Sequence, residues 1–379
     1  MIDWRSTENY LLLNPRLPEE TRQKFRGAWQ SFIAIRFQGR IGIATSGSSG
    51  ESFGRLIVLS KDAVLINAAA VNERLKSNSQ DIWYRTLPIF HVGGLSILAR
   101  AHLSGAQVVE DEIEKWNPQA FYENLTRSKA TLLSLVPTQV FDLVRLGLQA
   151  PPSLRAVIVG GGRFNSHLRE EALKLRWPVL PSYGMTEVAS QIATAVTPTE
   201  PALKPLSHVQ VRLGESGRLQ VSSPALLDAQ IIFNLHGEAS LSDPKKDGWL
   251  ETEDVAQINE DGTIEILGRI GDFIKIGGEG VVISRLEERL EKLKSELHFE
   301  GDAAVVAAKD DRLGAVIVLV SSADAGKTEE LVDLFNDGVA PFEEIRTVHQ
   351  VDSVPRSALG KLLRQPVLTL IGLESPTNL

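Results

Sequence analysis

Residues 180–194, LPSYGMTEVASQIAT, form the stretch around which the fold is organised, because a short apolar run, WPVL, ends here in a polar corner. The run predicts a strand, and open α/β sheets bind ligands at the carboxyl ends of their strands. Tyr183 offers a flat face to a ring, and Gly184 lets a backbone come close. Thr186 and Glu187 offer oxygens to a magnesium ion. An ordinary strand-to-loop turn also explains these residues, so the motif gains meaning from those around it.

Strand and helix patterns alternate along the chain before this stretch. The apolar runs predict strands, and apolar residues at helical spacing predict helices between them. Such alternation favours a largely parallel, doubly wound sheet of the α/β class. Strands are expected at residues 40–44, 83–87, 106–109, 131–136 and 154–159, and helices at 60–75, 95–103 and 137–146, with a further helix start at Pro18.

After about residue 198 the pattern changes to short strands separated by turns, which predicts a smaller β-rich subdomain; its strands are expected at residues 209–213, 218–221, 230–235 and 263–267. The stretch Gly-Arg-Ile-Gly-Asp at residues 268–272 is the expected domain boundary. It gives a large domain over residues 1–270 and a small α+β domain over residues 271–379. In the small domain, Ser284 is expected to cap a helix over 284–297, with Glu287 at the capping-box position.

Length and composition set limits on the class of protein. A chain of 379 residues suits two domains, and 43% hydrophobic and 23% charged residues are ordinary for a globular protein. The net charge of −8 gives no general attraction to nucleic acid. No apolar run approaches the ~20 residues that span a bilayer, and the first residues lack a signal-peptide pattern. We therefore expect a cytoplasmic protein; composition leaves a homo-oligomer open.

Cysteine is absent from the sequence. The chain therefore forms no disulfide, no thiolate metal site and no cysteine nucleophile. Any thioester that it makes needs a thiol from another molecule.

Two glycine-rich segments follow predicted strands. Residues 45–50, TSGSSG, can wrap a phosphate with backbone N–H groups, although such a loop is by itself more often a flexible connection. Residues 160–162 are three glycines, which leave room for a planar ligand or simply make a tight turn. The segment at residues 45–50 is not a Walker A loop, because no Gly-Lys-Ser/Thr follows it.

Several single residues are candidates for a site. His91 lies between an aromatic residue and two glycines at a strand-to-helix switch, where a pocket wall and a structural role are equally reasonable. Arg100 is on the next helix, and sequence alone favours a solvated charge there. Asp254 suits either the hydroxyls of a ribose or an exposed loop. Lys361 follows a glycine on a turn, where a basic residue is usually solvated surface.

Taken in order, these motifs resemble those of the acyl-adenylate-forming superfamily of acyl-CoA synthetases, adenylation domains and luciferases. The similarity runs from about Ile41 to Arg364. The segments LPIFHVGGLSIL, VIVGGGRF, SYGMTEVASQIAT and PRSALGKLLR are most similar to the o-succinylbenzoate–CoA ligases of menaquinone biosynthesis. The resemblance implies two steps with ATP, Mg²⁺ and CoA: a carboxylate attacks the α-phosphate of ATP, and the CoA thiol then displaces AMP from the acyl-adenylate.

The resemblance also implies roles for individual residues. Lys361, Glu187, Thr186 and His91 would be catalytic, with Glu187 also the magnesium ligand. The acid would contact His91, Gly94, Arg100 and Ser190, with Arg100 pairing with the ring carboxylate. After rotation of the small domain about Gly271, CoA would pass along Gly277, Gly278 and Glu279. ATP would be held by Thr45, Ser46, Gly47, Ser48, Ser49, Gly50, Arg55, Gly160, Gly161, Gly162, Ser182, Tyr183, Gly184, Asp254 and Arg269.

The sequence departs from the family pattern at four places. The phosphate loop continues as GESFGR in place of Gly-x-Pro-Lys-Gly, so Arg55 stands in for the usual lysine. The hinge position, often Asp or Lys, is Gly271, and Glu253 replaces a glycine of the Thr-Gly-Asp motif. The region before the phosphate loop is short for the family.

Two alternatives to this function follow from the same sequence. One is a ligase of the same class that acts on another aryl or fatty acid or loads a carrier protein. The other, suggested by the altered phosphate loop, is a protein that binds adenylates without catalysis. Because Glu187, Asp254, Arg269 and Lys361 all remain, we expect an active enzyme.

Overall fold

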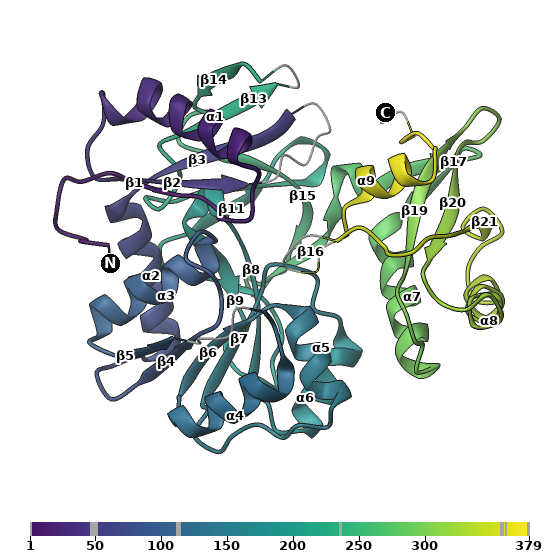
Figure 1. The fold of residues 1–379 in the computed structure, drawn as a ribbon, viewed down its shortest axis with the longest axis horizontal. Coiled ribbons are helices and arrows are strands. Elements are labelled where there is room, and N and C mark those ends of the chain that lie inside the picture. Colours follow the sequence, from purple (N-terminus) through teal and green to yellow (C-terminus); the bar gives the residue numbers. More distant parts are fainter. Residues whose placement is uncertain are drawn as a thin grey trace. The chain divides into compact units, whose positions relative to one another are not determined.

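The computed structural model describes residues 2–45, 52–110, 115–234, 237–356, 360 and 362–376. The chain divides into two compact units, which are described separately. The first unit consists of Met1–Thr252 with Gln257–Glu265, and the second of Glu253–Ala256 with Ile266–Leu379. Figure 1 shows the fold of each unit. Within the described ranges, no helix combines the length and apolar character needed to cross a membrane.

The first unit is built on a seven-stranded sheet with the order β10-β9-β8-β7-β6-β4-β5. Five of its strands run parallel, and β9 and β10 add antiparallel pairs at one edge. This arrangement confirms the expected α/β class. The strands are β4 (Ile82–Arg85), β5 (Gln107–Glu110), β6 (Leu132–Leu135), β7 (Ala156–Val159), β8 (Val179–Met185), β9 (Ser190–Thr194) and β10 (Lys204–Pro205).

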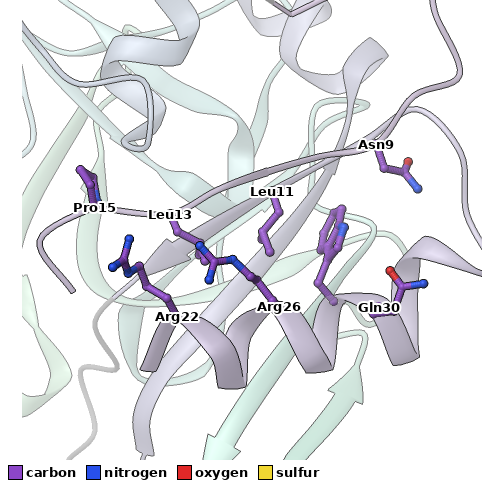
Figure 2. Close-up of a pocket in the computed structure, with 8 residues that line it drawn as sticks. Asn9, Leu11, Leu13, Pro15, Arg22, Arg26 and Gln30 are labelled. Atoms are coloured by element: carbon purple, nitrogen blue, oxygen red, sulfur yellow. The ribbon is translucent and has the colours of Figure 1, made fainter. Parts of the chain in front are cut away.

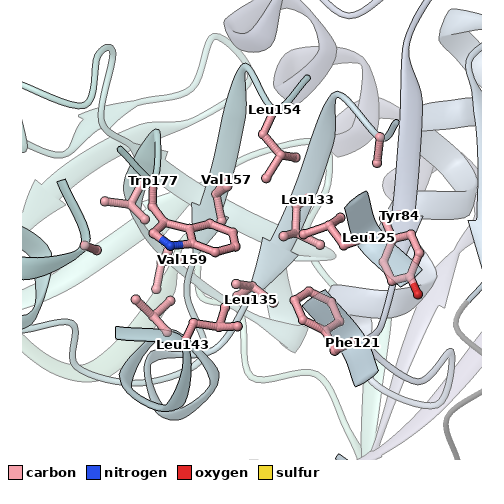
Figure 3. Packing of buried hydrophobic residues seen from close by; sticks show 14 residues of the cluster. Tyr84, Phe121, Leu125, Leu133, Leu135, Leu143, Leu154, Val157, Val159 and Trp177 are labelled. Atoms are coloured by element: carbon pink, nitrogen blue, oxygen red, sulfur yellow. The ribbon is translucent and has the colours of Figure 1, made fainter. Parts of the chain in front are cut away.

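Helices cover both faces of this sheet (Figure 1), so that alternate residues of each buried strand pack into different cores. One face packs against α2 (Lys61–Leu75) and α3 (Val92–Ser104), with Trp83, Leu132 and Ile158 in the core. The other face packs against α4 (Pro118–Ser128), α5 (Pro137–Arg145) and α6 (Ser166–Lys174). Figure 3 shows this second core, which contains Tyr84, Phe121, Leu133, Leu135, Val157, Val159 and Trp177.

A second sheet of the first unit has the order β1-β2-β3-β13-β14. Helix α1 packs on one face of it through Phe25, whose ring lies 4.9 Å from that of Phe233 at a nearly perpendicular angle. The sheet includes β13, which pairs with β3. The sequence instead places this strand in the β-rich subdomain. The elements are β1 (Tyr10–Leu12), α1 (Glu19–Trp29), π-helix η1 (Gln30–Ala34), β2 (Arg40–Thr45), β3 (Ser52–Ser60), β13 (Ala229–Asn234) and β14 (Ala239–Ser242).

The remaining strands of the predicted β-rich region form a four-stranded sheet with the order β11-β12-β15-β16. The division between the two units falls within its last two strands. The strands are β11 (Gln210–Leu213), β12 (Arg218–Ser222), β15 (Leu250–Ile258) and β16 (Ile264–Arg269), with a short 3-10 helix η3 (Glu215–Gly217) between the first two.

The second unit is an α+β fold around the sheet β19-β20-β21, preceded by a two-stranded hairpin. Leu286 and Leu290 of α7 pack on Val305, Ile317 and Leu319 of the sheet. Its elements are 3-10 helix η4 (Ile270–Asp272), β17 (Phe273–Ile276), β18 (Glu279–Val282), α7 (Ile283–Glu296), β19 (Ala303–Asp310), β20 (Gly314–Ser321), α8 (Ala325–Asn336), β21 (Ile345–Gln350) and α9 (Arg364–Leu370).

The predicted capping box of α7 is wrong. The strand β18 runs directly into the helix, so that Val282 is the N-cap residue and no side chain caps it. Ser284 therefore lies inside the first turn, where its buried hydroxyl makes no hydrogen bond within the described chain. Glu287 instead accepts two hydrogen bonds from Arg364, at 3.1 and 2.8 Å.

Candidate active site

The carboxyl ends of β7 and β8 bring together the three glycines and the Ser-Tyr-Gly corner. The two strands pair in parallel up to Val159 and Pro181, so that Gly160 directly faces the backbone of Ser182. A Cβ added at Gly160 would lie 3.3 Å from the Ser182 carbonyl oxygen, which leaves little room for any other residue. Gly161 has a φ of +79°, a conformation that favours glycine. The two interpretations of these glycines, a tight turn and a flat surface for a planar ligand, are therefore compatible with the same backbone.

The chain then folds back sharply between β8 and β9 through a short 3-10 helix, η2 (Thr186–Val188). Ala189 and Ser190 both have positive φ, at 55° and 144°. A Cβ added at Gly184 would collide with the carbonyl oxygen of Ser190, so the glycine is required by this close approach. The turn over residues 184–191 thus carries Thr186, Glu187 and Ser190 on a compact, strained piece of backbone.

The elements β2, β3 and η2 lie next to the predicted phosphate loop. Thr45, the last residue of β2, pairs directly with Arg55 of β3, and these two residues lie on either side of the glycine-rich loop. Ser46, Gly47, Ser48, Ser49 and Gly50 lie outside the described residues. Arg55 Nη2 is 3.9 Å from Glu187 Oε1, and the hydroxyl of Thr45 is buried without a partner in the described structure. A cation, a carboxylate and a hydroxyl therefore gather next to the predicted phosphate loop.

Arg100 lies at the other end of the turn, on α3. Its side chain is 1% exposed, so the solvated charge that sequence alone favours is wrong. Its Nη2 donates to Ser190 Oγ at 3.3 Å, and the guanidinium lies over the Trp83 ring, 5.5 Å from the centroid. Ser190 Oγ in turn donates to Ser96 Oγ at 3.4 Å. The structure confirms that Arg100 and Ser190 are neighbours, whereas Ser96 and Trp83 are not among the residues that the motifs single out.

Arg100 has no acidic partner among the residues that the structure describes. Its Nε is buried without a hydrogen bond, and burial lowers the pKa of the guanidinium to about 9. A buried charge without a counter-ion is costly. Because the guanidinium is still protonated at neutral pH, it has the charge and the unused donor that suit an anionic ligand.

His91 precedes α3 as its N-cap residue and stands close to Gly94 in the same turn. A Cβ added at Gly94 would collide with the carbonyl oxygens of Leu87 and Pro88, so this glycine lets the helix begin against the preceding loop. Burial lowers the pKa of His91, which keeps the ring neutral at pH 7. Its Nε2 is buried and makes no hydrogen bond in the part of the chain described.

The predicted ribose ligands lie in the second unit. Asp254, on β15, is 6% exposed and accepts a hydrogen bond from Arg269 Nε at 3.2 Å, so an exposed loop position is wrong for it. Arg269 also lies 3.8 Å from Glu253. The structure therefore brings Asp254 and Arg269 together, and the pair presents one carboxylate and one guanidinium on adjacent strands.

The remaining predicted residues of the second unit flank hairpins and turns. Gly277 and Gly278 form the two-residue turn between β17 and β18, both with positive φ as a hairpin of this type needs, and Glu279 begins β18. Gly271 lies in η4. Lys361 lies outside the described residues, but its neighbour Gly360 accepts a hydrogen bond from Arg356 Nη1 at 3.2 Å.

Ser182 and Tyr183, which are predicted to contact the nucleotide, lie on β8, because this strand continues to Met185 through the polar corner that the sequence places after it. Ser182 Oγ is 3.4 Å from the Ala193 carbonyl and accepts a hydrogen bond from Thr194 Oγ1 at 3.3 Å. This hydroxyl is thus already engaged in holding β8 to β9.

Asn67 is a buried polar residue that the motif analysis missed. It lies on the buried side of α2 between Val64 and Val71, and its side-chain amide bonds to the backbone of the turn that carries Glu187. The available signal was a polar residue at an apolar position of a helix, but its partners are more than a hundred residues away in the sequence.

A separate groove of the first unit is not this site. A cavity of about 500 Å³ lies between β1 and α1 (Figure 2), and no predicted site residue lines it. Its two arginines, Arg22 and Arg26, both pair with Glu19, at 2.6 and 2.9 Å. The groove therefore offers no set of converging chemical groups comparable to the turn over residues 184–191.

Comparison with known proteins agrees with this geometry. The model of the family described as AMP-binding enzyme matches residues 43–223. The 2-succinylbenzoate–CoA ligase of Bacillus cytotoxicus is 30% identical over 345 residues, which cover 87% of this chain and 69% of the relative. The ligase of the same name from Bacillus licheniformis is 30% identical over 335 residues, which cover 84% and 68%.

Solved structures show the same similarity. The o-succinylbenzoate CoA synthetase of Bacillus subtilis, in complex with the acyl-adenylate intermediate OSB-AMP, superposes with a TM-score of 0.72 at 26% identity, covering 86% of this chain and 68% of that chain. A single-residue variant of E. coli MenE with bound OSB-AMS has a TM-score of 0.75 at 20% identity, covering 97% of this chain and 88% of that chain, which shows a shared fold.

Fold and site together define an adenylate-forming enzyme of the AMP-binding class, an AMP-forming acid–thiol ligase. Within this class, the chain belongs to the 2-succinylbenzoate–CoA ligase family.

Proposed function

We propose that this protein ligates o-succinylbenzoate to CoA at the expense of ATP, through an acyl-adenylate. The aliphatic carboxylate attacks the α-phosphorus of ATP, an oxygen–phosphorus bond forms, and pyrophosphate leaves. The CoA sulfur then attacks the acyl carbonyl, a thioester forms, and AMP leaves. Family membership supports the reaction type and the acid.

The observation that carries the choice of acid is the buried charge of Arg100. o-Succinylbenzoate has a second carboxylate, on its ring, that takes no part in the chemistry and needs a partner. Arg100 is buried and lacks an acidic partner in the described chain, while its Nε has an unused hydrogen. A carboxylate bound there would complete a charge-assisted hydrogen bond in a site of low dielectric constant. Ser190, in contact with Arg100, is the second candidate ligand.

The groups around Glu187 suit the triphosphate of ATP with its magnesium ion. Mg²⁺ in nucleotide sites is usually bound by one or two carboxylates together with substrate phosphates. Glu187 supplies a carboxylate and Thr45 a hydroxyl without a partner in the described structure, so the donor set fits the ion. Arg55, 3.9 Å from Glu187, supplies positive charge where the family usually has lysine. The ion, when bound, helps to neutralise the phosphate charges.

The other roles follow the same chemistry. Gly160, Gly161, Gly162 and Tyr183 line the adenine, and Asp254 with Arg269 binds the ribose. His91, neutral at pH 7, walls the acid pocket without attracting the reacting carboxylate away from the phosphate. Lys361 neutralises charge on the α-phosphate in the first step. Rotation about Gly271 then brings Gly277, Gly278 and Glu279 to the CoA path for the second step.

The test is release of pyrophosphate from Mg-ATP with o-succinylbenzoate, with and without CoA, in the wild type and in Lys361→Ala. We expect release that requires this acid, thioester formation when CoA is added, and a loss of about 100-fold or more in the variant's first step. The variant should still form thioester from acyl-adenylate supplied from outside.

Two outcomes would contradict the proposal. Release with other acids but not with o-succinylbenzoate would identify a ligase of the same class with another substrate. Tight ATP binding without turnover of any acid would identify a protein that binds adenylates without catalysis.

A further inference from the structure

We propose that Asn67 is a positioning residue, which holds the turn that carries Glu187 and Ser190 and thereby sets both the nucleotide end and the acid end of the site. The inference deepens the proposed function, because it assumes that these two residues face the two substrates. Asn67 touches neither substrate in this account; it acts through the backbone of the turn.

The contacts of Asn67 enclose the turn from both sides. Its Nδ2 donates to the carbonyl oxygens of Val188, at 3.0 Å, and Gln191, at 2.8 Å. The amide N–H of Gln191 points back to Asn67 Oδ1 at 3.5 Å, at the outer limit for a hydrogen bond. The side chain is fully buried in the middle of α2. One amide group therefore ties a helix to the residues immediately before and after Ala189 and Ser190.

This turn needs such support. Two consecutive residues that are not glycine, Ala189 and Ser190, have positive φ. Residues keep such strained conformations only where several contacts with the surrounding structure hold the backbone in place. The carbonyl groups of Val188 and Gln191 lie beside this bend, and without Asn67 they would lose a buried donor. Asn67 thus offsets the strain of the turn at its two ends.

The same turn determines both halves of the site. Val188 directly follows Glu187, whose carboxylate lies 3.9 Å from Arg55. Gln191 directly follows Ser190, whose hydroxyl accepts a hydrogen bond from Arg100 at 3.3 Å. A shift of about 1 Å in either side chain is enough to lower the rate of a well-oriented reaction substantially.

His208 completes the environment of the amide. Its Nε2 lies 3.2 Å from Asn67 Nδ2, and burial lowers the pKa of the imidazole to about 4, so that the ring is neutral at pH 7. The carbonyl oxygens of Val188 and Gln191 identify the end of the Asn67 side chain that faces them as the NH₂ group. His208 Nε2 accepts from this group in the tautomer that carries its proton on Nδ1.

The experiment compares Asn67→Asp and Asn67→Ala with Asn117→Ala. The aspartate keeps the size of the side chain but turns an acceptor toward two carbonyl groups. Asn117 caps α4 on the opposite face of the sheet through a 3.0 Å bond to Ala120 N, so its loss controls for reduced stability. The readouts are KM for the acid, kcat for pyrophosphate release, the binding of acid and of Mg-ATP by calorimetry, and Tm.

We expect both Asn67 variants to raise the KM for the acid at least tenfold and to lower kcat at least tenfold, while Asn117→Ala changes neither by more than about twofold at a similar loss of Tm. In a double-mutant cycle, Asn67→Asp should raise the KM for the acid less in a Ser190→Ala background than in the wild type. The reason is that Asn67 acts on the acid through the position of the Ser190 hydroxyl, which the Ser190→Ala background lacks.

The inference would be overturned by a folded Asn67 variant with kinetic constants near those of the wild type. It would also be overturned if Asn67→Asp raised the KM for the acid by the same factor in the wild type and in the Ser190→Ala background. If Asn67→Asp does not fold, Asn67→Ala decides by the same criteria. The wild-type protein shows separately whether the proposed function holds. If the wild type uses another acid, the Asn67 variants are compared with that acid. If the wild type turns over no acid, the variants are compared by the binding of acid and Mg-ATP in calorimetry.

Discussion

Replacement of Arg100 by alanine is the most direct perturbation of the acid pocket. Arg100 is 1% exposed, and within the described chain its guanidinium donates a hydrogen bond to the side chain of Ser190. If the ring carboxylate of o-succinylbenzoate supplies the missing counter-ion, the variant leaves that carboxylate buried without its cation. Removal of one partner of such a pair typically costs about 2–5 kcal/mol.

This energy translates into a change in affinity, since about 1.4 kcal/mol corresponds to a factor of ten. We therefore expect the KM for o-succinylbenzoate to rise roughly 30-fold to 5,000-fold in Arg100→Ala, and the KM for ATP to change by less than about twofold. Arg100→Lys should fall between the wild type and alanine, because lysine keeps the charge but loses the planar fork.

The assay is pyrophosphate release at saturating Mg-ATP over a range of acid concentrations. Arg74→Ala is the matched control, because Arg74 lies on the neighbouring helix α2 and donates to the backbone carbonyls of Thr194, Lys204 and Pro205. Its loss should lower Tm without a selective effect on the acid. As a second control, an analogue of the acid without the ring carboxylate should bind the wild type and Arg100→Ala equally. Equal increases of both KM values in Arg100→Ala, or an undiminished preference for the ring carboxylate, would refute the pairing.

Three further outcomes are expected. Arg55→Ala should raise the KM for ATP roughly 10-fold to 150-fold, as for a lost hydrogen bond to a charged group, and leave the KM for the acid unchanged; an unaltered ATP titration would contradict this. Arg364→Gln should slow pyrophosphate release by about tenfold but not thioester formation from supplied acyl-adenylate, because Arg364 anchors the chain after Lys361 to Asp272 and Glu287; equal slowing of both half-reactions would argue against it. Arg155 and neighbouring donors lower the pKa of Asp81 to about 2, despite the opposing effect of its burial. This carboxylate therefore stabilises the fold above pH 4 by about 1–2 kcal/mol, after allowance for the exposed arginine, and the stabilisation is lost as the pH falls through about 2. Urea unfolding between pH 5 and 2 should accordingly show a smaller pH dependence in Asp81→Asn.

The sequence predicted the fold where local pattern and tertiary packing agree. The buried strand β7 is apolar throughout, and β6 is apolar except for Ser134, because helices cover both faces of the sheet. The pattern failed where a distant partner decides the structure. Strand β13 joins β3, more than 150 residues earlier, and nothing in its own sequence indicates which sheet it enters. Ser284 has the spacing of a capping box, yet the direct passage of β18 into α7 starts the helix before it.

The site was predictable to the extent that its residues lie in short motifs. Thr45, Glu187 and Ser190 each belong to a short segment that is ambiguous by itself and becomes informative through its order among the other motifs. The burial of Arg100 was not predictable from α3, because an arginine in a helix has the same local pattern whether it faces water or a pocket. Asn67 was missed for the same reason: its partners at Val188 and Gln191 become neighbours only when α2 packs against the turn.

The buried cations of the first unit distinguish a working ligase from a protein that merely retains the fold. Lys61 is buried, but its Nζ donates to the carbonyls of Asp3 and Ser6 and to the Ser6 hydroxyl. Such a group is explained by stability alone. Arg100 is more deeply buried and keeps an unused donor within the described chain, so it costs stability unless an anion fills the pocket. Selection for stability alone would replace it with an apolar residue of similar volume. Its presence beside Ser190 favours an acid-binding enzyme over a protein that binds only the nucleotide.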